Sequence, residues 1–214
     1  MLITLKIVFR KTMPNCVSVT GVKKIVLILL IFSFIGCDIF KTRTPENPVQ
    51  VRTKWTPTTT VDILIDNLKS SLNEKSTENY LRCLIDSITT NRNFVFIPAS
   101  ESYAIYPNLF MNWGVLNERI YFENVKSRLK ENSGMTLSLY NEERGTVQGD
   151  SLIYAADYQL LVDHSLEDMP KKFEGHLQFT LFRDFKGEWA IITWKDMKKN
   201  ESKTWSDLKG RFSY

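Results

Sequence analysis

Near residue 135 the apolar residues of this chain change their spacing, which limits the folded part to a helical first half and a strand-rich second half. Before Met135, apolar side chains recur every three or four residues, as at Ile65, Leu68 and Leu72. After Met135 they alternate with polar side chains. Helices followed by hairpin-linked strands favour an α+β layering in which helices cover one face of an antiparallel sheet.

Three helices are predicted in the first half, at 61–72, at about 76–88 and at about 117–130, with Thr59 or Thr60 and Ser76 as caps of the first two. Residues 94–97 form a short apolar run, predicted as a brief strand or a buried segment. The apolar side chains between Ser100 and Trp113 are predicted to lie on a loop.

Four longer strands are predicted, at 135–140, 151–162, 173–182 and 188–194, separated by turn residues. In the second strand, Tyr154, Ala156 and Tyr158 share one face, whereas Asp157 and Gln159 share the other.

An apolar segment near the N-terminus predicts where the protein is located. Lys23 and Lys24 precede eleven residues, 25–35, of which only Ser33 is polar, and Gly36-Cys37 follows. A transmembrane helix needs about 20 apolar residues, so this segment is too short to span a bilayer. Phe34-Ile35-Gly36-Cys37 resembles the signal box of bacterial lipoproteins, which implies export, cleavage before Cys37 and lipidation of that cysteine with chains such as palmitate.

This interpretation divides the chain into a signal peptide (1–36), a lipidated cysteine with a polar tether containing prolines (37–59) and one domain (60–214). Met13 is a second plausible initiator besides Met1. The expected location is the cell envelope, on the periplasmic or outer-membrane side, and the leaflet is left open.

Charge argues against nucleic acid as a partner. Five of the 28 basic side chains and none of the 24 acidic ones precede Cys37, so 23 basic and 24 acidic side chains remain after cleavage. A phosphate-binding surface needs clustered Lys and Arg. The basic residues near the C-terminus alternate with acids and are interpreted as a solvated face; they are Lys198, Lys199, Lys203, Lys209 and Arg211.

Cysteine and histidine spacing predicts no metal site and no cofactor. Cys83 is interpreted as a small buried apolar residue rather than a nucleophile. His164 and His176 are expected at the surface, because a metal site needs three or four convergent ligands and the sequence offers no such set.

The order of elements, ending in Gly187-Glu188-Trp189-Ala190-Ile191-Ile192-Thr193-Trp194-Lys195-Asp196, resembles the NTF2-like, or SnoaL-like, superfamily. There the last strand commonly reads Gly, a polar residue, Trp, Ile, then Trp and an acid. The resemblance implies a cone of three N-terminal helices packed on a curved antiparallel sheet, with a pocket between them, and dimerisation through the outer sheet face. Trp205 and Leu208 are expected to pin the tail to the domain.

Isomerase-type members of that superfamily carry a Tyr on the first helix and an Asp on a strand. Residues 61–72 contain no Tyr, so Asp157 is the one catalytic candidate, with a solvent-facing position as its alternative. The ligand-binding candidates are aromatic: Tyr103, Tyr106, Phe110, Trp113 and Tyr158.

The expected function is that of a membrane-anchored, non-catalytic binding or structural module. The alternative is a SnoaL-like isomerase, dehydratase or cyclase acting on an apolar small molecule. Partners are expected to be the membrane, through the lipid, and an apolar small molecule or an envelope protein. A second copy of the chain is a further possible partner.

Overall fold

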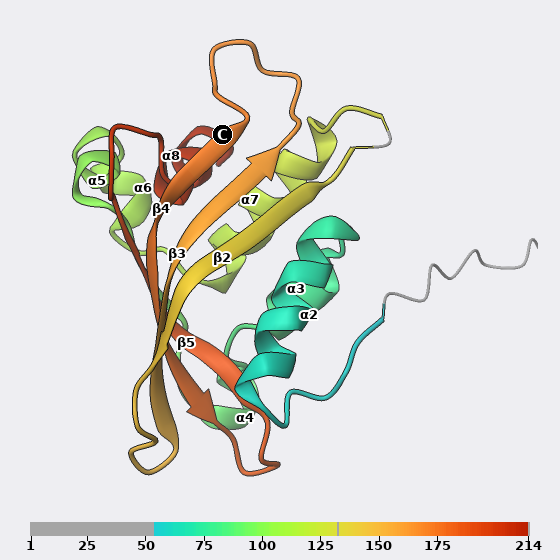
Figure 1. Cartoon of the computed structure of the whole chain (residues 1–214), viewed down its shortest axis with the longest axis vertical. Coiled ribbons are helices and arrows are strands. Elements are labelled where there is room, and N and C mark those ends of the chain that lie inside the picture. The colour runs from blue at the N-terminus through green and yellow to red at the C-terminus, as the bar shows by residue number, and fades with distance from the viewer. Residues whose placement is uncertain (1–53, 132, 214) are drawn as a thin grey trace, which may run out of the picture. The chain divides into compact units, whose positions relative to one another are not determined.

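The computed structural model describes residues 54–131 and 133–213, which form a five-stranded sheet with helices packed against it (Figure 1). The strands are β1 (Val95–Ile97), β2 (Met135–Arg144), β3 (Ser151–Val162), β4 (Lys172–Arg183) and β5 (Trp189–Met197). Their order is β1-β5-β4-β3-β2; β1 runs parallel to β5, and the other pairs are antiparallel. The predicted α+β fold class is confirmed.

Seven helices lie in the described residues: α2 (Val61–Asn73), α3 (Thr77–Arg82), α4 (Ser87–Thr90), α5 (Ser100–Ile105), α6 (Pro107–Phe110), α7 (Val115–Ser127) and α8 (Trp205–Arg211). The caps follow the sequence prediction, because the Thr60 and Ser76 side chains accept hydrogen bonds from backbone N–H groups three residues later. Thr204 and Asp207 form a capping box at the start of α8.

Two helical predictions are wrong. The second helix ends at Arg82 rather than near Ile88, because the backbone at Cys83 and Ile85 pairs with Ile191 of β5 and leaves the helix. The loop predicted between Ser100 and Trp113 contains α5 and α6. Both helices are so short that no amphipathic repeat marks them in the sequence.

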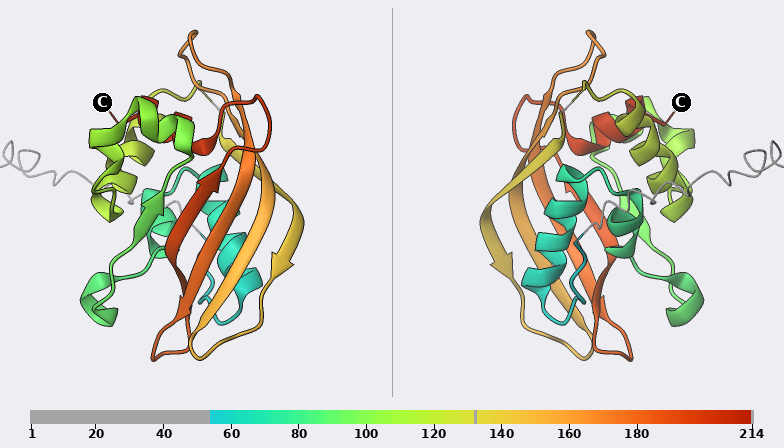
Figure 2. Two further views of the ribbon diagram at one scale, coloured as in Figure 1. Left: turned by 90° about the vertical axis from the view of Figure 1, so that its left-hand side faces the viewer. Right: turned by 90° about the vertical axis from the view of Figure 1, so that its right-hand side faces the viewer.

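The faces of the sheet follow the predicted alternation. Along β3, Tyr154, Ala156 and Tyr158 are buried, whereas the residues between them are partly exposed. The helices lie on the same side of the sheet as these buried residues. The left-hand view of Figure 2 shows the sheet from its opposite face. Each strand therefore has an inner, buried face and an outer face.

The segment before α2 contacts the domain. Thr58 is buried, its carbonyl accepts a hydrogen bond of 2.8 Å from the backbone N–H of Trp189, and Asn67 is hydrogen-bonded to Thr56. Residues 54–59, which the sequence analysis assigned to the tether, thus pack against α2 and β5.

The predicted signal peptide, Cys37 and most of the predicted tether lie outside the described residues. Within the described part of the chain, no helix has the length and apolar character needed to cross a bilayer.

Candidate functional site

The C-terminal helix α8 packs into the interior between the sheet and the helices. Trp205, Leu208 and Phe212 are buried there, which confirms that Trp205 and Leu208 pin the tail. The Trp205 indole N–H donates to the Tyr121 hydroxyl at 2.9 Å, and the Trp205 ring lies edge-on to Trp194 with centroids 4.6 Å apart. The chain therefore fills this space with its own tail.

A buried ion pair joins α8 to α7. The ammonium of Lys209 donates a hydrogen bond to Oε1 of Glu118, and both side chains are completely buried. The same carboxylate accepts hydrogen bonds from the Trp113 indole at 2.7 Å and from the Tyr80 hydroxyl at 2.8 Å. Glu118 thus receives three donors from three different parts of the fold, which offsets the cost of burying its charge.

Aromatic rings complete the surroundings of Lys209. Its Nζ lies 3.7 Å from the ring centroid of Phe96 and 3.9 Å from that of Trp194, and 5.7 Å from the rings of Trp113 and Tyr121. Each distance lies within the range of cation–π attraction. We call the set Phe96, Trp113, Glu118, Tyr121 and Trp194 the ammonium cage.

Burial lowers the pKa of Lys209 to about 8, and the Glu118 carboxylate opposes that shift by favouring the charged form. The sequence prediction that Lys209 belongs to a solvated basic face is wrong, because its side chain is 0% exposed. Lys199, Lys203 and Arg211 do remain at the surface.

A second buried carboxylate anchors the start of α8. Asp196 accepts hydrogen bonds from the Tyr158 hydroxyl at 2.8 Å and from the backbone N–H of Ser206 at 2.7 Å. The Tyr158 hydroxyl oxygen in turn accepts a hydrogen bond of 2.7 Å from the backbone N–H of Trp205. Burial raises the pKa of Asp196, while the hydrogen bonds from Ser206 and Tyr158 oppose the rise. Tyr158 fits here because Gly175, its partner across the strands, has no side chain.

The predicted ligand-binding residues do not line an open pocket together. Tyr103 is exposed, whereas Phe110, Trp113 and Tyr158 are buried in the core. Tyr106 packs against α8 so closely that a Cβ atom on Gly210 would lie 2.5 Å from its ring. Four of the five thus contact α8, the ammonium cage or one another.

Asp157, the catalytic candidate, lies on the outer face of the sheet. Its carboxylate accepts hydrogen bonds from His176 at 2.9 Å, from Asn141 at 2.7 Å and from the Lys199 ammonium. These donors, with Lys199 contributing most, hold the pKa of Asp157 well below its usual range. A carboxylate held in the charged form outside the interior is unsuited to serve as a base in an apolar pocket.

This arrangement predicts an acid-sensitive contribution to stability. Because the pKa of Asp157 is lower in the folded state than in the unfolded chain, where it is about 3.9, the contribution is complete above that value. It is lost as the pH falls through that value toward the folded pKa. When the pH is lowered from 5 to 2, the wild type is expected to lose about 1 kcal/mol more unfolding free energy than Asp157→Asn. Urea titrations at the two pH values measure the difference. Equal losses in both proteins would contradict this.

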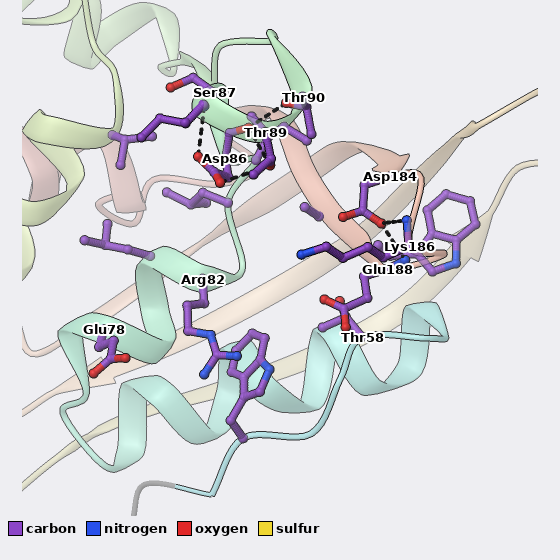
Figure 3. A pocket seen from close by; sticks show the side chains of 18 of the residues that line it. Thr58, Glu78, Arg82, Asp86, Ser87, Thr89, Thr90, Asp184, Lys186 and Glu188 are labelled. Atoms are coloured by element: carbon purple, nitrogen blue, oxygen red, sulfur yellow. Dashed lines mark hydrogen bonds between the residues drawn. The ribbon is translucent and has the colours of Figure 1, made fainter.

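A cavity of about 760 Å³ lies at another part of the domain, between α3, α4, the β4–β5 turn and the segment before α2 (Figure 3). The Arg82 guanidinium stacks over the Trp55 ring at 4.1 Å, and Leu84 and Ile85 contribute apolar lining. The Asp184 carboxylate accepts hydrogen bonds from the backbone N–H groups of Lys186 and Glu188, which shapes the turn. The lining mixes both charge signs, and none of the predicted ligand-binding residues belongs to it.

Cys83 and the histidines are placed in three different settings. Cys83 is buried, as predicted, and burial raises the pKa of its thiol, so it is poorly suited to be a nucleophile. His164 was predicted at the surface but is buried between Phe173 and Phe212, whereas His176 is partly exposed. Among residues 54–131 and 133–213, no cluster of His, Cys, Asp or Glu is arranged to hold a metal ion.

Sequence reasoning missed Glu118, Asp196 and Lys209 as members of a buried polar network. Asp196 offered a signal, because it falls on the inner face of β5, whose other inner positions are apolar. Glu118 and Lys209 each stand in a polar stretch and offered none.

The sequence matches no protein-family model and no curated protein. Solved structures with a similar fold include a conserved protein from Planctomyces limnophilus DSM 3776, 12% identical, with a TM-score of 0.50 over 64% of this chain and 91% of that one. Others are an NTF2-like superfamily protein from Salmonella enterica serovar Typhimurium (11% identical, TM-score 0.46, 64% and 87% covered) and a ketosteroid isomerase-like protein from Erwinia carotovora atroseptica (9%, 0.45, 65% and 94%).

At these identities the likeness concerns the fold alone. The helices on one face of a curved, open sheet form the NTF2-like cone that the sequence predicted.

Proposed function

We propose that this protein is a lipid-anchored module of the bacterial cell envelope, whose NTF2-like domain binds or supports a partner without catalysis. The observation that carries the non-catalytic part is the position of α8. The resemblance implies a pocket between sheet and helices, and in that space Lys209, Trp205 and Leu208 of the chain's own tail are buried.

The observation that supports the anchor is the run of Phe34, Ile35, Gly36 and Cys37 after an apolar segment too short to span a bilayer. The alternative, a SnoaL-like enzyme, gains no support from Asp157, which lies on the outer face with its carboxylate engaged by three donors.

The partner side of the proposal concerns the cavity around Arg82 and Trp55. Its lining mixes charged and apolar side chains, which suits a segment of an envelope protein better than a wholly apolar small molecule. The outer sheet face is proposed as the contact between two copies of the chain, as the resemblance implies.

Metabolic labelling with radioactive palmitate tests the anchor. We expect the wild type to be labelled and to sediment with membranes, and Cys37→Ser to lose both properties, because the thioether forms on that sulfur. Cys83→Ser is the matched control, since its thiol is buried in the domain and its labelling should equal that of the wild type. Equal labelling of Cys37→Ser and wild type would refute the anchor.

A further inference from the structure

The ammonium cage has the composition of a ligand-binding site. Ring faces that surround a cation are used in proteins to recognise ammonium groups, and a carboxylate adds specificity for a group with N–H donors. Phe96, Trp194 and Glu118 supply these parts. The cage residues come from β1, β5, α7 and, in the case of Trp113, the turn that precedes α7, so α8 contributes only the occupant.

Lys209 occupies the cage as a ligand would. A lysine ammonium carries three N–H donors, and in the described residues its hydrogen bond goes to Glu118 while the rings of Phe96 and Trp194 lie closest to the nitrogen. Burying such a pair is a weak way to stabilise a fold, because apolar residues of similar volume often do as well or better.

We propose that the ammonium cage is a recognition site for a primary ammonium group on an unbranched alkyl chain, and that Lys209 of α8 fills it as an internal ligand. A ligand of this class reaches the cage when α8 is displaced, so the tail acts as a plug. The proposal goes beyond the module function and does not depend on the lipid anchor.

The geometry also sets the size of the group. With Nζ at 3.7 and 3.9 Å from two ring centroids, a methyl group on the nitrogen that pointed at either ring would overlap the ring carbons. The site therefore favours a primary over a quaternary ammonium.

Chemical rescue of Lys209→Ala tests the proposal. The substitution removes three methylene groups and the ammonium, which n-propylammonium replaces. We expect n-propylammonium at about ten times its Kd to raise the melting temperature of the variant by about 3–6 °C, whereas n-propanol and trimethylpropylammonium do not. The wild type, whose cage is filled, should not respond.

Two further variants separate ammonium recognition from simple filling of space. Leu208→Ala leaves a cavity beside the same helix, and n-propylammonium should raise the melting temperature of this variant no more than n-propanol does. Adding Glu118→Gln to Lys209→Ala should remove the advantage of n-propylammonium over n-propanol.

If Lys209→Ala does not fold without additive, recovery of its near-UV circular dichroism signal on adding each probe replaces the melting temperature. Equal responses to n-propanol and n-propylammonium, a response of the wild type as large as that of the variant, or no response to either probe would overturn the proposal.

Discussion

Replacing Glu118 with glutamine is expected to lower the free energy of unfolding by about 3–5 kcal/mol, because it leaves a completely buried ammonium without its counter-charge. Glutamine keeps the shape of the side chain but offers one acceptor oxygen to the donors of Trp113, Lys209 and Tyr80. Urea unfolding followed by tryptophan fluorescence measures the change.

Glu123→Gln is the matched control. Glu123 lies on the same helix and also pairs with a lysine, Lys126, but its side chain is 51% exposed. Exposed pairs contribute about 0–1 kcal/mol, so this variant should remain close to the wild type. If the two variants lost the same stability, burial of the Glu118 pair would not add to its energetic effect, which would contradict the prediction.

Replacing Trp205 with alanine is expected to cost about 3–5 kcal/mol. The side chain is completely buried, packs against Trp194 and Tyr158, and donates a hydrogen bond to Tyr121. Its removal leaves a cavity at the base of α8 and an unpaired hydroxyl. Thermal and urea unfolding of the variant provide the measurement.

The control for this prediction is Trp55→Ala. Trp55 is only partly buried, stacks with Arg82 and lines the cavity near the β4–β5 turn. The cost there should be about 1 kcal/mol, because little apolar surface returns to water. A Trp205→Ala protein as stable as Trp55→Ala would mean that α8 does not contribute to the interior.

Much of the sheet could be predicted because strand alternation is a local property. The buried positions of β3 at Tyr154, Ala156 and Tyr158 follow from a period of two that any single strand displays. The caps at Thr60 and Ser76 are local for the same reason, since a hydroxyl reaches a backbone N–H only three residues away.

The interior site could not be predicted, because its parts are distant in the sequence. Lys209 and Glu118 lie 91 positions apart, and nothing near either residue marks it as buried. Near Lys209 the alternating charges of the tail indicated a solvated face, and the packing of Trp205 and Leu208 overrode that local pattern. His164 was misplaced for the same reason, because Phe212, the residue that follows α8, packs against it.

The tail that contains α8 lies in the interior between the sheet and the helices. In the described residues, the tail occupies the space where the resemblance places a ligand, and the cavity lined by Arg82 and Trp55 lies elsewhere, at the β4–β5 turn.

A double-mutant cycle on Glu118→Gln and Lys209→Met tests most directly whether the buried pair holds α8 in the interior. Urea unfolding of the wild type, both single variants and the double variant gives the coupling energy. We predict a coupling of about 2–3 kcal/mol, with the double variant clearly more stable than the summed single losses imply. Additive losses, with a coupling below about 0.5 kcal/mol, would contradict the account.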